Sequence, residues 1–198
     1  MLRYILIAGN AGTGKTTLAR DIQSRIGDSA RIYGLADPIK YMASALVGTP
    51  PCTDPVKHID SKKHKILTWT QNARTVREML QTLGTEWGQD FGGREMWCNY
   101  LVTRAALDFM YDKFLVAIIH DVRFQHEFEF FRRLDSDCTL IYTTNYWDHN
   151  CGNTGDDHAS EQLDWVCHVA RKTIKKYFIF APEHRQDVLE KVELDYAS

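Results

Sequence analysis

The chain has 198 residues, of which 44% are apolar and 12% aromatic, and 24 basic against 26 acidic side chains leave a formal net charge of -2. This length predicts one domain with a substantial core, and the near-neutral charge predicts no nucleic-acid partner. The lack of an 18-residue apolar run or a signal-like N-terminus argues against membrane insertion and secretion. We therefore expect a cytoplasmic protein whose five cysteines are reduced thiols.

The most informative motif begins at Gly9, where residues 9–16 read GNAGTGKT and match the phosphate-loop pattern G-x-x-x-x-G-K-[ST]. An apolar, strand-like run precedes it, and a stretch with apolar residues four apart follows it, as expected for a helix. Such a loop turns consecutive N–H groups toward phosphate oxygens, and the helix N-terminus adds positive charge. We predict a nucleoside triphosphate site in which Lys15 reaches the β- and γ-phosphates and the Thr16 hydroxyl binds Mg²⁺.

Strand-like and helix-like segments alternate along the rest of the chain. Further strands are predicted at 31–35, 114–119, 138–143 and 177–180, and helices at 36–47, 75–83, 94–112, 125–134, 161–175 and 183–192. The helix at Thr75 starts with a capping-box spacing to Glu78, and we expect it to end at Gly84, a natural helix-terminating residue. The pattern predicts an α/β fold, a three-layer α/β/α sandwich with a five-stranded parallel sheet.

The long interval between the second and third predicted strands indicates an insertion. It holds roughly eighty mostly helical residues, more than one crossover needs. We expect a single domain with a core of residues 1–36 and 113–198 and a helical insert of about residues 37–112 that binds a second substrate. The basic stretch 57–65 is expected to be a solvated surface, with a transient phosphate contact as the alternative. The polar run 145–161 follows a strand at the active end and predicts a lid-like loop.

Two charged residues follow the predicted strand 114–119 closely. Asp121 stands where phosphate-loop proteins keep an acidic Mg²⁺-binding residue, and Arg123, two residues on, suits phosphate. The alternatives are an Asp that caps the next helix and a surface Arg paired with Glu127. In the insert, Arg77 suits a monophosphate and Trp97 suits a base or ribose. Taken alone, however, Arg77 is better explained by a solvated helix face and Trp97 by a core position.

Several segments together resemble the bacteriophage deoxynucleoside monophosphate kinases, and they span nearly the whole chain. Besides the phosphate loop they are LADPIK at 35–40, TVREMLQTLGTE at 75–86, the MW pair at 96–97, DVRFQHE at 121–127 and DHASE at 157–161. The resemblance implies a phosphate-loop kinase that transfers the γ-phosphoryl group of ATP to a deoxynucleoside 5′-monophosphate. For a phage-encoded chain, the cytoplasm would be that of the host.

The resemblance also implies which residues bind and react. ATP and Mg²⁺ would be held by Gly12, Thr13, Gly14, Lys15, Thr16 and Thr17, with Thr16 and Asp121 on the metal. The acceptor would be lined by Ile39, Lys40, Arg77, Gly84, Thr85, Trp97, Asp121, Arg123 and Glu127. The catalytic residues would be Lys15, Asp121 and Arg123. The sequence has no Arg or Lys between Arg133 and Arg171, so the lid-like run brings no cation to the phosphoryl group.

Two other functions remain open at this point. One is a kinase of another small phosphorylated acceptor, resembling dephospho-coenzyme A kinase or phosphomevalonate kinase. The other is a nucleotide-dependent switch, although a GTPase is disfavoured because residues 145–148, NYWD, lack the lysine of the guanine motif N-K-x-D. The sequence also allows a homodimer through exposed aromatic side chains of the insert, and it does not predict the preferred base.

Overall fold

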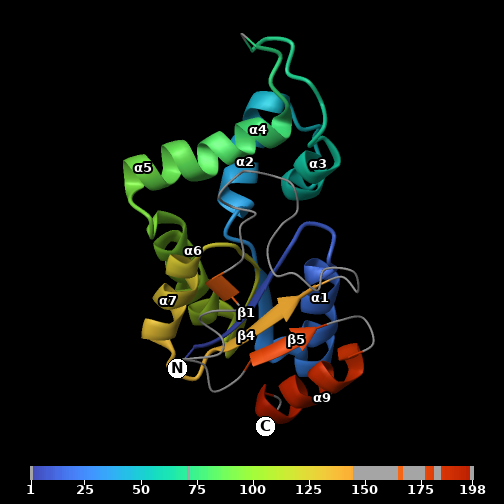
Figure 1. The fold of residues 1–198 in the computed structure, drawn as a ribbon, viewed down its shortest axis with the longest axis vertical. Helices are drawn as coiled ribbons and strands as arrows, with labels where there is room; N and C mark the ends of the chain where they lie inside the picture. Colours follow the sequence, from blue (N-terminus) through green and yellow to red (C-terminus); the bar gives the residue numbers. More distant parts are fainter. Residues whose placement is uncertain (1, 71, 145–164, 167–176, 181–183, 197–198) are drawn as a thin grey trace. The chain divides into compact units, whose positions relative to one another are not determined.

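The chain folds around a parallel sheet of five strands in the order β2-β3-β1-β4-β5 (Figure 1). The structure, a computed structural model, describes residues 2–70, 72–144, 165–166, 177–180 and 184–196. The strands are β1 (Arg3–Gly9), β2 (Ala30–Tyr33), β3 (Val116–Val122), β4 (Thr139–Thr143) and β5 (Tyr177–Phe180). Every neighbouring pair is parallel. The prediction of a five-stranded parallel sheet is therefore confirmed.

Helices cover both faces of this sheet. They are α1 (Lys15–Ile26), which continues into the 3₁₀ turn η1 (Gly27–Ser29), α6 (Met96–Asp112), α7 (Gln125–Leu134) and α9 (Arg185–Tyr196). On one face α1 and α9 share a core with strand residues such as Ile7 and Ile118. Successive side chains of a strand point to opposite faces, so Tyr4 lies on the face opposite Ile7. There, the ring centroid of Tyr4 is 5.2 Å from that of Phe131 in α7. The three layers agree with the predicted α/β/α sandwich.

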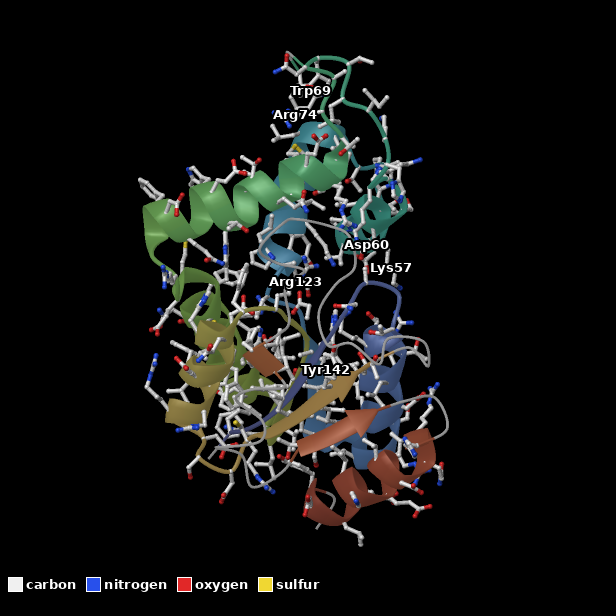
Figure 2. All side chains as sticks on the ribbon, viewed as in Figure 1. Lys57, Asp60, Trp69, Arg74, Arg123 and Tyr142 are labelled. Carbon is white, nitrogen blue, oxygen red and sulfur yellow. The ribbon has the colours of Figure 1, made fainter. Side chains whose placement is uncertain are left out.

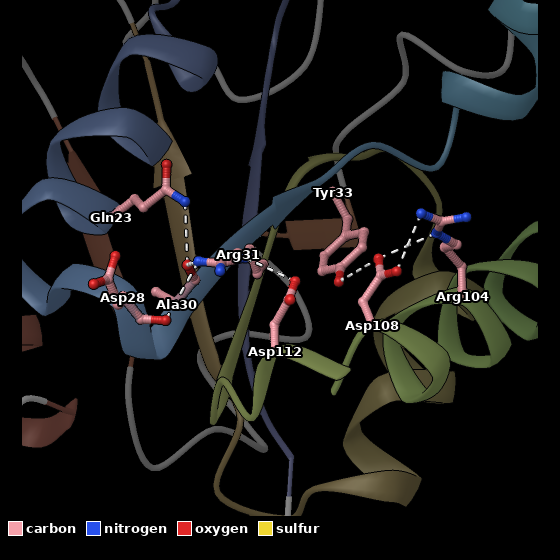
Figure 3. A network of polar contacts seen from close by, with 8 residues as sticks. All are labelled: Gln23, Asp28, Ala30, Arg31, Tyr33, Arg104, Asp108 and Asp112. Atoms are coloured by element: carbon pink, nitrogen blue, oxygen red, sulfur yellow. Dashed lines mark hydrogen bonds and ion pairs between the residues drawn. The ribbon is translucent and has the colours of Figure 1, made fainter. Parts of the chain in front are cut away.

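Polar contacts tie the edge strand β2 to α6 (Figure 3). The Tyr33 hydroxyl donates to Asp108 Oδ2 at 3.1 Å, and Arg104 Nε donates to the same oxygen at 3.1 Å. Burial and the nearby Asp108 carboxylate raise the pKa of Tyr33 above its usual value. At the start of the strand, Arg31 pairs with Asp112 at 3.7 Å. Side chains of α6 thus hold one edge of the sheet.

Two compact units make up the chain. One consists of Met1–Gly34 and Cys98–Ser198 and carries the sheet, and the other is the helical unit Leu35–Trp97. The boundary lies within α6, whereas the predicted insert extends to the end of that helix. The reason is packing: the C-terminal part of α6 contacts the sheet-bearing unit through the edge-to-face pair of Phe109 and Phe114 and through the Tyr33–Asp108 hydrogen bond.

The helical unit contains α2 (Asp37–Val47), α3 (Pro55–Ser61), α4 (Val76–Gln81), the π-helical segment η2 (Thr82–Trp87) and α5 (Gly88–Gly92). Helix α3 lies partly in the basic stretch and is not among the predicted helices. Its start has a clear cause, because Asp54 accepts hydrogen bonds from the N–H groups of Val56 and Lys57, and Pro55 occupies the first helical position.

Helix α4 begins as predicted but continues past its predicted end. The capping box is present: Glu78 N–H donates to Thr75 Oγ1 at 3.2 Å, and Thr75 N–H donates to Glu78 Oε2 at 2.7 Å. The prediction that the helix ends at Gly84 is wrong, because α4, η2 and α5 follow one another without a break to Gly92. Packing explains the glycine instead: a Cβ at Gly84 would stand 3.0 Å from Ile39 Cδ1.

Gly88, one turn further on, is a tighter contact and supports a stability prediction. A Cβ there would lie 2.4 to 2.7 Å from three atoms of the Trp97 indole, a rigid ring whose Nε1–H donates to Gly84 O at 2.8 Å. We expect Gly88→Ala to destabilise the protein by about 1–3 kcal/mol in urea unfolding. The matched Gly84→Ala meets only a flexible methyl and gains helix propensity, so it should cost less than about 1 kcal/mol. Equal stabilities of the two variants would contradict the contact with Trp97.

Candidate active site

The glycine loop joins β1 to α1 at the carboxyl edge of the sheet, and its backbone leaves the start of α1 open. Gly14 is the N-cap residue of α1 with φ 81° and ψ 16°, a left-handed conformation that glycine adopts without strain. No side chain caps this helix. Thr16 and Thr17 on its first turn are exposed. The first N–H groups of a helix attract anions, so the predicted phosphate site has the local geometry it needs.

The ammonium group of Lys15 is folded onto its own loop. Lys15 Nζ donates to Gly9 O at 2.7 Å and to Asn10 O at 2.5 Å. Both acceptors are backbone carbonyls of the same loop that the phosphate pattern describes. The lysine is therefore anchored over the loop, where phosphate oxygens would replace carbonyl oxygens as acceptors.

A pair of threonine hydroxyls links the loop to β4, a contact that the sequence does not predict. Thr13 Oγ1 donates to Asn10 O at 2.9 Å and lies 2.7 Å from Thr143 Oγ1, whose own hydroxyl reaches Ala8 O at 3.2 Å. Thr13 and Thr143 are both buried. Because Gly9 pairs with Thr143 across the sheet, the last residue of β4 supports the first turn of the loop.

Asp121 lies at the carboxyl end of β3, beside the end of β1, where the glycine loop begins. The register between the two strands shifts there: Leu6 pairs with Ile119, but Ala8 pairs with Val122. Strand β3 thus contains one extra residue, a bulge at the His120–Asp121 step. Bulges re-aim side chains and are frequent beside active sites. The Asp121 side chain is buried, 7% exposed.

Arg123, labelled in Figure 2, follows β3 directly, and two hydrogen bonds hold its backbone. Its N–H donates to Glu127 Oε2 at 2.7 Å, and its carbonyl accepts a hydrogen bond from Trp165 Nε1 at 2.9 Å. Glu127 Oε2 also accepts from Phe124 N–H at 3.0 Å. The Glu127 carboxylate therefore caps α7 and orients the Arg123 peptide. The contact of Glu127 with a substrate stays a prediction.

The environment of Glu127 shifts its titration strongly. Burial raises the pKa of its carboxyl to about 7, and the Asp121 carboxylate adds to the rise, although the hydrogen bonds from the Arg123 and Phe124 N–H groups oppose it. The side chain is 5% exposed. A carboxylate that is charged at neutral pH in the unfolded chain is thus only partly ionised in the folded protein.

This shift predicts a pH dependence of stability. The folded pKa lies above the unfolded value, so the native state binds more protons between about pH 4.5 and 7, and stability falls as the pH rises through that window. We expect the free energy of unfolding of the wild type, measured against that of Glu127→Gln, to drop by roughly 2–3 kcal/mol from pH 4.5 to 7.5. A difference in the free energy of unfolding between the wild type and Glu127→Gln that does not change with pH would show that Glu127 titrates normally.

In the helical unit, three residues predicted to bind the acceptor lie together. Ile39 packs under Gly84, and the Trp97 ring N–H donates to Gly84 O. Trp97 is 6% exposed and faces Gly88. The structure gives Trp97 a packing role in this unit, and its stacking on a base or ribose stays a prediction. Thr85 lies within η2 and is half-buried.

Lys40 and Arg77, the two predicted cations of this unit, differ in their surroundings. Lys40 is buried, and its ammonium lies 3.1 Å from Asp60 on α3 and 3.7 Å from Asp37 (Asp60 is labelled in Figure 2). Burial alone would raise the pKa of Asp60, but the ammonium groups of Lys63 and Lys40 outweigh it and lower that pKa. Arg77 lies on α4, half-buried, and its N–H donates to Lys63 O at 3.0 Å.

Oxygen donors suitable for Mg²⁺ stand at the sheet edge, namely the Thr16 hydroxyl and the Asp121 carboxylate. Within the described ranges no cluster of three or more His, Cys, Asp or Glu side chains is arranged to hold a metal ion. In kinase and ATPase sites Mg²⁺ is usually bound through one or two carboxylates, substrate phosphates and water. The predicted lid-like loop at 145–161 lies outside the described residues. None of the helices in the described part is long and apolar enough to cross a bilayer.

A parallel α/β/α sandwich with a lysine-bearing glycine loop after its first strand, and an acidic residue at the end of the neighbouring strand β3, is the fold of phosphate-loop nucleotide-binding proteins. The deoxynucleotide monophosphate kinase family model matches residues 48–164, more than half of the chain. The chain belongs to that family, which confirms the resemblance and identifies a kinase. The matched range does not include the glycine loop at residues 9–16. The loop and the family match are therefore two separate observations that both agree with a kinase.

Other comparisons are more distant. An unliganded sugar kinase from Janibacter sp. HTCC2649 is 13% identical, with a TM-score of 0.42, over 100% of this chain and 96% of that one. Shikimate kinase from Acinetobacter baumannii in complex with shikimate is 13% identical, with a TM-score of 0.40, over 97% of this chain and 91% of that one. No curated protein matches the sequence significantly.

Proposed function

We propose that the protein transfers the γ-phosphoryl group of ATP to a deoxynucleoside 5′-monophosphate. The observation that carries the proposal is the loop at the start of α1, where Lys15 stands over an uncapped helix N-terminus in a chain of the deoxynucleotide monophosphate kinase family. This arrangement suits a nucleoside triphosphate, and the family supports a deoxynucleotide as the acceptor.

The reaction needs positioning and neutralisation of charge more than covalent catalysis. An oxygen of the acceptor phosphate attacks the γ-phosphorus, the bond from that phosphorus to the bridging oxygen breaks, and ADP leaves. The acceptor phosphate is ionised near pH 7, so no strong general base is required. Gly12, Thr13, Gly14, Thr16 and Thr17 would present the loop to ATP, and Lys15 would bind its β- and γ-phosphates.

The residues at the end of β3 and just after it would act together with the start of α1. Asp121 and Thr16 would hold Mg²⁺, which supplies positive charge to the β- and γ-phosphate oxygens when bound. Arg123 would bind a phosphate oxygen through its planar guanidinium. From the helical unit, we propose that Arg77 and Lys40 contribute charge, and Ile39, Gly84, Thr85 and Trp97 shape the part that accepts the nucleoside.

A coupled assay of ADP release with Mg²⁺-ATP against dAMP, dCMP, dGMP and dTMP tests the proposal. ADP release that requires one of these acceptors supports it and reveals the preferred base. ATP binding without release for any of the four would overturn it in favour of another phosphorylated acceptor, such as dephospho-coenzyme A or phosphomevalonate. Nucleotide binding without turnover on any acceptor would indicate a binding module.

A further inference from the structure

The backbone of Arg123 has anchors that the kinase reaction does not itself require. Arg123 stands between the last residue of β3 and the first residue of α7, outside both regular hydrogen-bond patterns. Its N–H is held by Glu127 at 2.7 Å and its carbonyl by the indole N–H of Trp165 at 2.9 Å. Two fixed points on one residue orient its Cα–Cβ bond, which is where the arginine side chain starts.

Trp165 is itself fixed on the sheet-bearing unit. Its ring stacks on Phe128 with centroids 5.8 Å apart and an interplanar angle of 27°, and Phe128 is fully buried in α7. The next residue, Val166, is also fully buried. In sequence Trp165 is far from Arg123, so the hydrogen bond between them joins the loop after β3 to a distant part of the chain.

We propose that Trp165 is a positioning residue for the acceptor: its indole N–H, with Glu127, holds the Arg123 peptide so that the guanidinium is pre-oriented for the acceptor phosphate. The inference rests on the proposed function. Pre-orientation lowers the cost of ordering a long side chain at binding. Trp165 does not contact the substrate, and its effect passes through Arg123.

The variant Trp165→Phe tests this because it keeps an aromatic ring to stack on Phe128 while it removes the N–H donor together with the second ring of the indole. We expect the KM of the preferred deoxynucleoside monophosphate to rise about three- to tenfold, as for loss of one hydrogen bond, with the KM of ATP and the melting temperature nearly unchanged. Trp69→Phe, at an exposed tryptophan of the helical unit, is the matched control and should match the wild type.

A double-mutant cycle measures whether the effect passes through Arg123. Calorimetric titration of the acceptor into the wild type, Trp165→Phe, Arg123→Ala and the double variant should show that the Trp165 change weakens binding only when Arg123 is present. Equal weakening in both backgrounds would overturn the proposal, as would equal changes in the KM of ATP and of the acceptor.

Spectroscopy gives a readout that does not depend on turnover. The indole ¹H–¹⁵N signal missing in Trp165→Phe belongs to Trp165, and it should shift when the acceptor is added to the wild type but not to Arg123→Ala. A signal that is indifferent to the acceptor in both proteins contradicts the coupling. A wild type that releases no ADP with any deoxynucleotide refutes the proposed function, whereas an active wild type with an unchanged Trp165→Phe refutes the positioning role alone.

Discussion

Replacing Lys15 with alanine should lower acceptor-dependent ADP release by about a thousandfold or more. The Lys15 ammonium donates to Gly9 O and Asn10 O, so it is anchored on the loop that would receive the phosphates. In the transition state it would neutralise charge on the β- and γ-oxygens, and alanine supplies none. The measurement is the coupled assay at saturating Mg²⁺-ATP, with the acceptor that the wild type prefers.

Folding should survive this change. Leu18 and Ile22 of α1 are buried in the core, and replacing Lys15 removes an amine rather than a buried apolar side chain. The melting temperature should therefore stay within a few degrees of the wild type, and Lys62→Ala, at an exposed lysine, should keep full activity. If Lys15→Ala retains more than about a tenth of the wild-type rate, the glycine loop is not part of the catalytic site.

Much of the fold could be predicted because its signals are local. The central strands are buried on both faces, so they read as unbroken apolar runs such as Ile5–Ala8 and Val116–Ile119. The helix at Thr75 has a reciprocal cap that needs only four residues. Helix α3 has an equally local signal, Asp54 followed by Pro55, but the charge of the basic stretch beside it favours a solvated surface and hides the helix start.

The features that could not be predicted depend on contacts between distant residues. Gly84 looks like the end of a helix, because glycine usually stands there, and only the position of Ile39 reveals that it makes room within one. The bulge at Asp121 is a property of the register between β1 and β3. The same holds for Trp165, which has no motif of its own and meets Arg123 only through tertiary packing on α7.

In the candidate site, too, the residues with local sequence signals could be predicted, and those that depend on distant contacts could not. Lys15, Thr16 and the open start of α1 belong to one short motif, so the sequence was sufficient to place them together. Asp121 stands at the end of a recognisable strand and Arg123 just after it, and the parallel sheet brings that end to the glycine loop. By contrast, Thr143 supports the loop from a neighbouring strand, and nothing in its own sequence context distinguishes it from other strand threonines.

Gly9→Ala should have the largest effect on stability, a loss of about 3 kcal/mol or more together with loss of nucleotide binding. A Cβ at Gly9 would stand 2.2 Å from Thr143 Oγ1 and 2.4 Å from the Thr143 carbonyl oxygen, in a backbone conformation with φ 151°. The carbonyl cannot move without breaking the pairing of β1 with β4, so the loop itself has to shift. Urea unfolding and titration with ATP measure the two effects.

Gly12→Ala distinguishes two reasons for a glycine in this loop, namely the close approach of neighbouring atoms and a left-handed backbone conformation. Gly12 has φ 80°, but a Cβ there would meet no atom within 4 Å, so its cost should be only the left-handed strain of about 1 kcal/mol. Adding Thr143→Ala to Gly9→Ala removes the hydroxyl contact but leaves the carbonyl one. It also removes the buried hydrogen bonds of the Thr143 hydroxyl to Thr13 and Ala8 O, so the double variant should stay well below the wild type in stability. If Gly9→Ala proves no worse than Gly12→Ala, then backbone conformation alone selects glycine at the first loop position, and β4 does not hold the loop from below.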